Sequence, residues 1–234
     1  MSPIESNLQH IRTLINAAIA GPHHETQRPV VLVAVSKTKS VDDVRKAFVA
    51  GQRDFGENYV QEAIAKIEAL TDLRASGIVW HFIGPLQSNK LKLVANHFDW
   101  VHGIDRLKIA TGLSRYRSGQ ASGHQALNAC IQVNVSGERS KSGVAPEDAM
   151  ALAAEVALLP QLKLRGLMTI IEQTADQATQ RAQFRKMRTL FELMRSQSSD
   201  VDTLSMGMSQ DFTVAISEGA TMVRIGSAIF GTRE

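Results

Sequence analysis

The stretch from Val30 to Ser40 reads V-V-L-V-A-V-S-K-T-K-S, and it sets the pattern for the rest of the chain. Six apolar residues in a row, four of them valine, are typical of a short strand buried on both faces. Lys37 lies where that strand ends, a place in which an amine is partly desolvated and becomes available to attack a carbonyl. An ordinary solvated lysine that caps the strand is the alternative, since most lysines are exposed.

Strands alternate with helices on both sides of this stretch. Apolar residues at spacings of three and four predict helices, and short apolar runs between them predict strands. The predicted strands lie at 30–35, 53–56, 78–83, 100–103, 129–135, 164–170, 203–206 and 222–225. The predicted helices lie at 3–20, 41–50, 57–70, 90–96, 106–115, 146–158, 177–196, 211–219 and 227–230.

This alternation indicates an α/β protein with a parallel sheet and right-handed crossovers. Eight strand-helix units in 234 residues predict a (β/α)8 TIM barrel, formed as a single domain over residues 1–234. The extra N-terminal helix is expected to close the base of the barrel. A doubly wound open sheet is the alternative architecture, but no Gly-x-Gly-x-x-Gly motif follows the first strand.

Composition narrows the classes of function. The net charge of +3 comes from scattered bases, which argues against nucleic-acid binding and suits a small anionic ligand. Cys130 is the one cysteine and is expected in the core, so the sequence predicts neither a disulfide nor a metal site. His23 and His24 are expected to be exposed rather than metal ligands. A signal-peptide core and an apolar run of membrane-spanning length are both lacking, so a cytoplasmic protein without a membrane partner is expected.

In a barrel of this kind the chemistry lies at the carboxyl ends of the strands. Glycines and serines end the seventh and eighth predicted strands, each just before a helix. Backbone N–H groups, hydroxyls and a positive helix end together bind a phosphate dianion, although a simple helix cap would use the same residue types. The residues at these two strand ends include Ser205, Met206, Gly207, Ser209, Arg224, Gly226 and Ser227.

A lysine, a phosphate site and Arg224 in one barrel suggest pyridoxal 5′-phosphate (PLP), whose aldehyde forms a Schiff base with a lysine. Arg224 as the partner of the ring nitrogen would keep that nitrogen unprotonated, because a guanidinium has no proton to give at neutral pH. The ring would then be a weak electron sink. An ion pair of Arg224 with Glu218 or Asp211 is the alternative role for this side chain.

Seven blocks in chain order resemble the pyridoxal phosphate homeostasis protein family, the YggS-like single-domain relatives of alanine racemase. The resemblance covers nearly the whole chain, with two small departures, serine at position 227 and Gly103 after His102. The blocks are VAVSKTK around Lys37, FGENYVQEA at 55–63, WHFIGPLQSNK at 80–90, SKSGV at 140–144, LRGLMTI at 164–170, LSMGMSQD at 204–211 and VRIGSAIFG at 223–231.

The resemblance implies a barrel like the N-terminal domain of alanine racemase, with PLP as its cofactor. It implies Lys37 as the Schiff-base lysine, Asn58 near the cofactor ring and Arg224 at the pyridine nitrogen. Ser209, Gly226 and Ser227 would surround the phosphate. Met206, at the end of the seventh strand, is also expected at the cofactor. Roles for His81 and Lys141 stay open between the site and ordinary packing or solvent.

Binding a cofactor differs from catalysis, because racemisation needs acid/base groups on both faces of the substrate carbon. In alanine racemase the second group is a tyrosine from an additional domain, whereas Tyr59 and Tyr116 are expected to lie away from the barrel mouth. The family therefore implies a non-catalytic carrier that buffers PLP and supplies PLP-dependent apo-enzymes. A monomer is the default expectation, because alanine racemase dimerises through its additional domain. A PLP-dependent amino-acid racemase using Lys37 with His81 or water is the alternative, and a phosphate-sugar barrel enzyme without PLP is a third possibility.

Overall fold

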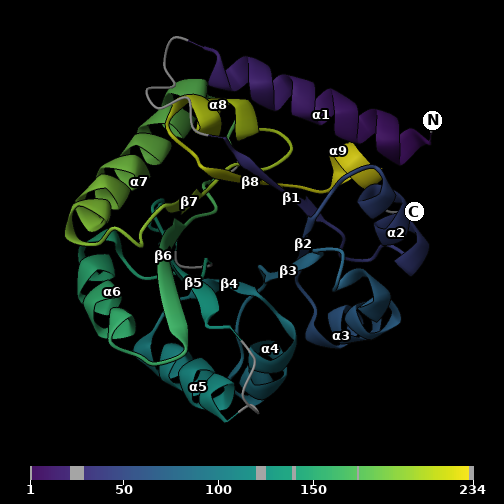
Figure 1. Cartoon of the computed structure of the whole chain (residues 1–234). Helices are drawn as coiled ribbons and strands as arrows, with labels where there is room; N and C mark the ends of the chain where they lie inside the picture. The colour runs from purple at the N-terminus through teal and green to yellow at the C-terminus, as the bar shows by residue number, and fades with distance from the viewer. Residues whose placement is uncertain (1, 22–28, 120–124, 139–140, 173, 232–234) are drawn as a thin grey trace.

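Eight parallel strands close on themselves to form a barrel, in which each strand pairs with the next and β1 pairs with β8. The computed structural model describes residues 2–21, 29–119, 125–138, 141–172 and 174–231, and Figure 1 shows the ring of strands inside a ring of helices. The strands are β1 Val31–Val35, β2 Asp54–Glu57, β3 Val79–Phe82, β4 Trp100–Ile104, β5 Leu127–Gln132, β6 Leu162–Met168, β7 Thr203–Ser205 and β8 Met222–Ile225.

Helices follow the strands and cover the outside of the barrel. The predicted α/β barrel is confirmed, with the strands in the predicted order. The α-helices are α1 Pro3–Ile19, α2 Val41–Val49, α3 Val60–Ala69, α4 Leu91–His97, α5 Leu107–Ser118, α6 Ala149–Ala157, α7 Gln177–Gln197, α8 Phe212–Ser217 and α9 Ser227–Phe230. Short 3-10 turns lie at Thr71–Leu73, Ser88–Lys90 and Pro146–Asp148.

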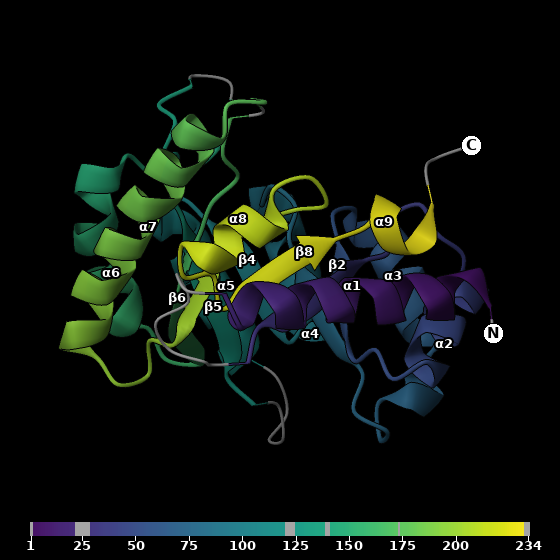
Figure 2. The same cartoon turned by 90° about the horizontal axis from the view of Figure 1, so that it is seen from above.

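The N-terminal helix α1 does not close the base of the barrel, contrary to the expectation from the sequence. It lies along the outer wall, against α2, α8 and α9 (Figures 1 and 2). The reason is that α9 is only one turn long and leaves the outer side of β8 and β1 without a full helix. Leu8, Ile11 and Ile15 are buried there, and the Asn7 side chain donates a hydrogen bond to the Ile229 carbonyl at 2.9 Å.

The helix expected over 57–70 starts later than predicted. Glu57 is instead the last residue of β2, and α3 begins at Val60 after the exposed Tyr59. Glu57 stays in the strand because its Oε1 accepts hydrogen bonds from Ser36 and Lys66 inside the protein. The end of β2 is therefore tied to the end of β1, where Lys37 follows.

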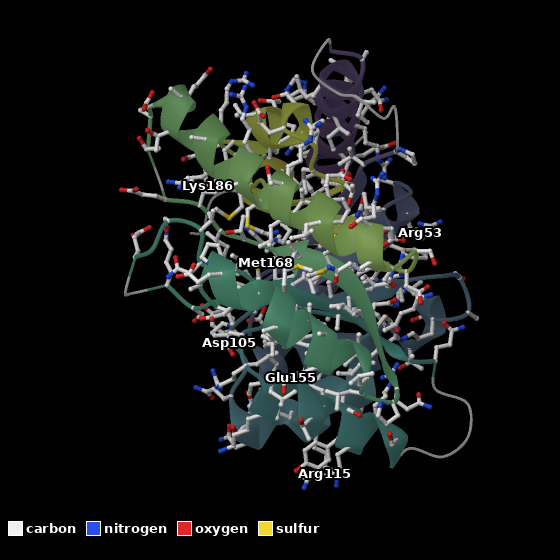
Figure 3. The ribbon with its side chains drawn as sticks, turned by 90° about the vertical axis from the view of Figure 1, so that its left-hand side faces the viewer. Arg53, Asp105, Arg115, Glu155, Met168 and Lys186 are labelled. Atoms are coloured by element: carbon white, nitrogen blue, oxygen red, sulfur yellow. The ribbon has the colours of Figure 1, made fainter. Side chains whose placement is uncertain are left out.

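The buried apolar residues form two distinct clusters. The large cluster joins the strands to the helices, and the small one comprises Val33, Trp100, Cys130, Met168 and Met222. Figure 3 faces the side of the barrel covered by α6 and α7, which carry the exposed Glu155 and Lys186, with the buried Met168 labelled. Cys130 is buried, as expected from its apolar surroundings in the sequence.

Some of the expectations from the sequence concern residues that the structure does not describe. His23, His24 and Ser140 of the SKSGV block lie outside the described residues. Among the residues that the structure does describe, no helix is long and apolar enough to cross a membrane. Within the same ranges, no group of three or more histidine, cysteine or acidic side chains could hold a metal ion.

Candidate functional site

The loop after β1 presents Lys37 at the carboxyl end of the barrel. Its neighbours on both sides are held: the Ser36 hydroxyl donates to Glu57 Oε1 at 2.7 Å, and the Thr38 N–H donates to Glu62 Oε1 at 2.5 Å. Thr38 has a φ of 64°, a left-handed conformation that is uncommon for a residue with a side chain. Such a conformation persists only where the surroundings impose it, so the loop holds Lys37 in one place.

A cavity of about 300 Å³ opens beside this loop at the ends of the strands. Its size is close to the lower end of the range for pockets that hold small molecules. The cavity is lined by Val35, Lys37, Thr38, Lys39, Asn58, Ile83, Ile170, Met208, Ser209, Arg224, Gly226, Ser227 and Gly231. Six of the seven residues predicted to hold the cofactor therefore meet in one place, although they come from β1, β2, β7, β8 and the loops that follow.

Asn58 lies on one side of the cavity with a polar atom left unused. Its Oδ1 is buried and has no hydrogen-bond partner among the residues that the structure describes. A Cβ added to Gly84 would lie 2.4 Å from the Asn58 carbonyl oxygen, so only glycine permits this approach of the two loops. A Cβ at Gly103 would likewise lie 2.9 Å from the Gly84 oxygen, so a side chain at this position would require one of the two loops to shift.

Arg224 is buried, lines the cavity and is held by one residue of β7 and by the residue that follows β6. One terminal nitrogen donates to the Ser205 hydroxyl at 2.7 Å, and the other donates to the Thr169 carbonyl at 2.8 Å. Burial lowers the pKa of Arg224 to about 10, while the charge of Asp211 raises it. The guanidinium therefore stays charged at neutral pH, and the cavity contains a fixed donor of hydrogen bonds.

The two acidic residues considered as alternative partners of Arg224 are engaged elsewhere. Glu218 forms ion pairs with Arg181 at 2.8 Å and Arg185 at 2.9 Å. Asp211 accepts a hydrogen bond from the Met208 N–H at 2.5 Å, and burial raises the pKa of its carboxyl. Asp211 thus acts on Arg224 through its charge, and Arg224 lines the cavity.

The other end of the cavity is suited to an anion. The hydroxyls of Ser209 and Ser227 lie 3.4 Å apart at the ends of β7 and β8. Gly226 caps α9, and a Cβ there would lie 3.1 Å from the Val35 carbonyl oxygen, so the glycine lets β8 approach β1. The first N–H groups of a helix have no partner within it, and they add donors to those of the two hydroxyls.

Met206, His81 and Lys141 do not line the cavity. Met206 is fully buried in the core, and Met208, two residues further along, lines the cavity in its place. His81 is fully buried and contacts Asp54 and His102. Lys141 donates to the Ile171 carbonyl at 2.9 Å and pairs with Glu138.

The sequence reasoning also left out the apolar wall of the cavity. Ile83 and Ile170 each follow a strand end, and with Met208 they give the cavity an apolar side. Their position as the last residues of the predicted third and sixth strands is the signal that could have identified them.

Comparison with known proteins places these features in a family. The family model described as "Alanine racemase, N-terminal domain" matches residues 4–234. The chain is similar to the "Pyridoxal phosphate homeostasis protein" of Pseudomonas aeruginosa, with 53% identity over 100% of this chain and 97% of that protein. The protein of the same name from Escherichia coli K12 is 48% identical over 100% of this chain and 98% of that protein.

Solved structures agree with the sequence comparisons. PipY of Synechococcus elongatus with PLP bound is 36% identical, covers 97% of this chain and 100% of its own, and gives a TM-score of 0.80. Alanine racemase from Corynebacterium glutamicum, at 16% identity and a TM-score of 0.67, shares the fold over 99% of this chain and 61% of its own. The chain belongs to the alanine racemase N-terminal domain family and, within it, to the pyridoxal phosphate homeostasis proteins.

Proposed function

We propose that this chain binds PLP as a Schiff base on Lys37 and acts in intracellular PLP homeostasis, holding and releasing the cofactor without strong catalysis of its own. The observation that carries the proposal is the cavity itself, in which Lys37, the buried Arg224 and the serine pair Ser209 and Ser227 meet. PLP-dependent apo-enzymes are the proposed recipients. Residues 1–234 are proposed to work as a single domain and as a monomer.

The residues present fit PLP at each of its polar parts. The phosphate would lie against Ser209, Gly226 and Ser227, where hydroxyls and free N–H groups gather. The unpartnered Oδ1 of Asn58 could accept a hydrogen bond from the ring hydroxyl of PLP, and this buried oxygen would then have a partner. Arg224 would face the ring nitrogen as a donor.

When bound, PLP supplies an aldehyde that condenses with a primary amine, forming a carbon-nitrogen double bond and releasing water. Lys37 provides the amine, and the hydrogen bonds at Ser36 and Thr38 fix the direction from which it approaches. Arg224 would face the ring nitrogen as a donor and would leave it unprotonated, since the pKa of this guanidinium, at about 10, keeps its protons in place at neutral pH. This arrangement favours holding the cofactor over withdrawing electrons from a substrate.

A racemase remains the competing function, and it requires a second acid/base group opposite Lys37. Of the described residues that line the cavity, Lys39 is the other amine, and none is a tyrosine or histidine. The test is to load the protein with PLP and incubate it with L-alanine and other L-amino acids, beside Lys37→Ala. We expect uptake of PLP that depends on Lys37 and no D-enantiomer or keto acid above the control. Sustained turnover would contradict the carrier role and would show that the protein is an enzyme.

The carrier role has its own test. Loaded protein, separated from unbound PLP, is mixed with an apo-enzyme whose activity depends on PLP, and the recovery of that activity is followed. We expect recovery to approach completion, matched by loss of the visible absorbance of the donor. An apo-enzyme that stays inactive while the donor keeps its PLP would contradict a role in supply.

A further inference from the structure

A line of hydrogen bonds runs through the inside of the barrel from Arg224 to Asp54. Arg224 donates to Ser205 Oγ at 2.7 Å, and Ser205 Oγ lies 3.0 Å from Nδ1 of His102. Nε2 of His102 lies 3.0 Å from Nδ1 of His81, whose Nε2 lies 2.9 Å from Oδ1 of Asp54. Five strands contribute one residue each to this line, in the order β8, β7, β4, β3 and β2.

The line crosses from one end of the barrel to the other. Arg224 lines the cavity, whereas Asp54 is the first residue of β2 and its side chain is 27% exposed. Ser205, His81 and His102 between them are fully buried. The His81 ring also stacks on Trp100 with an interplanar angle of 13°, which fixes its orientation. Buried polar groups arranged in this way must use one another as partners.

Arg224 at one end of the line and the Asp54 carboxylate at the other determine which nitrogen of each histidine carries the proton. We call this arrangement the proton order. A guanidinium only donates, so Ser205 Oγ accepts from Arg224 and its own hydrogen goes to Nδ1 of His102. With both rings neutral, Nε2–H of His102 donates to Nδ1 of His81, and Nε2–H of His81 donates to the Asp54 carboxylate. Each donor and acceptor on the line then has a partner.

The reverse order leaves groups unsatisfied. If His102 donated from Nδ1, Ser205 Oγ would accept twice, and its hydrogen would lose the partner that this line provides. Burial holds the pKa of His102 well below its usual range, and the charge of Arg224 acts in the same direction, so this ring carries a single proton. Besides these groups, the charge of Asp211 and the Cys130 thiol also act on Arg224, and both favour its charged form.

We propose that His102 is a positioning residue for the cofactor: by accepting the Ser205 proton at Nδ1, it turns the Ser205 oxygen toward Arg224 and fixes the guanidinium at the ring-nitrogen position. His102 does not line the cavity and acts through Ser205 and Arg224. This inference rests on the proposed binding of PLP. Thr169 alone would hold one side of the guanidinium and leave it free to turn.

The proton order is tested first in the unloaded protein. Long-range proton-nitrogen NMR correlations of 15N-labelled protein report which ring nitrogen of each histidine carries the proton, and His81→Asn and His102→Asn variants assign the signals. We expect both rings in the Nε2–H form at pH 7.5. A proton on Nδ1 of His102 would overturn the proposal, because Ser205 would then have no acceptor there. This result does not depend on whether PLP binds.

The coupling to the cofactor is tested with a matched pair of variants. His102→Asn places an amide oxygen near the position of Nδ1 and retains the acceptor for Ser205, whereas His102→Leu has a similar size and no acceptor. We expect His102→Leu to weaken PLP affinity roughly tenfold, the usual worth of a hydrogen bond to a charged group, and His102→Asn to stay within about threefold of the parent.

Ser114→Ala controls for the loss of a buried side-chain hydrogen bond elsewhere in the fold, since Ser114 donates to the Pro160 carbonyl at 2.6 Å and does not line the cavity. It should bind PLP as the parent does. The absorbance of bound PLP should shift in His102→Leu but not in His102→Asn, which a merely structural role would not produce. Equal losses in the Leu and Asn variants, or none in either, would overturn the proposal. If the parent itself takes up no PLP, the proposed function fails, and the NMR result still decides the proton order.

Discussion

Nζ of Lys66 lies 2.9 Å from Oε1 of Glu57, and both side chains are buried next to the loop that carries Lys37. The same Nζ donates to the Ser36 carbonyl at 2.6 Å and to Oε1 of Glu62 at 2.6 Å. Glu57 and Glu62 in turn accept from the residues on either side of Lys37. A second lysine, which forms no part of the cavity lining, therefore fixes the backbone around the first.

Removing this buried charge should destabilise the fold strongly. Lys66→Met leaves Glu57 buried without its cation, and breaking a buried pair in this way costs about 3–5 kcal/mol. Burial already raises the pKa of Glu57 above its usual value, with Lys66 opposing that rise. The free energy of unfolding from urea titrations checks the expectation. Lys163→Met is the matched control, because its 3.0 Å pair with Asp200 is exposed, and such pairs contribute about 0–1 kcal/mol. Equal losses in both variants would contradict this account.

The contact between Gly84 and Asn58 predicts a defect in cofactor binding. A Cβ at position 84 would lie 2.4 Å from the Asn58 oxygen and 2.9 Å from its Cα, so Gly84→Ala must push Asn58 away. We expect PLP affinity to fall at least several-fold, together with about 1–3 kcal/mol of stability lost to overpacking. PLP titrations and thermal unfolding measure the two effects. Gly119→Ala, whose Cβ would have 3.7 Å contacts, is the control. Unchanged affinity in Gly84→Ala would show that Asn58 does not contact the cofactor.

The buried His102 predicts a loss of stability in mild acid. Burial holds the pKa of its ring well below the usual 6.5, so the unfolded chain binds a proton that the folded protein does not. The contribution of the neutral His102 ring to the free energy of unfolding is fully present above pH 6.5. It falls as the pH drops below 6.5, by up to about 1.4 kcal/mol per pH unit. Urea titrations between pH 7.5 and pH 5.5 measure the slope. The slope should flatten in His102→Asn, and identical slopes would exclude His102 as the cause.

Cys130 should be inert in the folded protein. It is fully buried inside the barrel, and burial raises the pKa of its thiol to about 12. The thiolate is the reactive form, so alkylation by iodoacetamide at pH 8 should be negligible until the chain is unfolded in urea. Mass spectrometry of the treated protein follows the modification. Fast labelling without denaturant would contradict the position of Cys130 in the core.

The sequence predicted the architecture because strand-helix alternation is a local signal repeated eight times. Strand β8 and helix α9 were placed at their observed bounds. The start of α3 was predicted too early, because nothing local reveals that Glu57 is needed as an acceptor for Ser36 and Lys66.

The residues of the candidate site also fall into those that the sequence could predict and those that it could not. Residues in the loops that follow strand ends, such as Lys37 after β1 and Ser209 after β7, could be predicted from position alone, since every strand ends at the same side of the barrel. Met206 and Met208 could not be separated, because which of them faces the cavity depends on how the chain turns at Gly207, whose φ is 95°. The line from Arg224 to Asp54 depends on pairing between strands far apart in sequence, which no local pattern contains.

The most direct test of the central claim is reductive trapping with peptide mapping. Protein incubated with PLP is reduced with borohydride and digested, and mass spectrometry locates the attached cofactor. We predict about one cofactor per chain on Lys37, disappearance of the visible absorbance on reduction, no trapping in Lys37→Ala and normal trapping in Lys39→Ala, which alters the neighbouring amine of the cavity. Cofactor trapped on Lys39, scattered over surface lysines, or undiminished in Lys37→Ala would contradict the assignment of Lys37 and of this cavity to PLP.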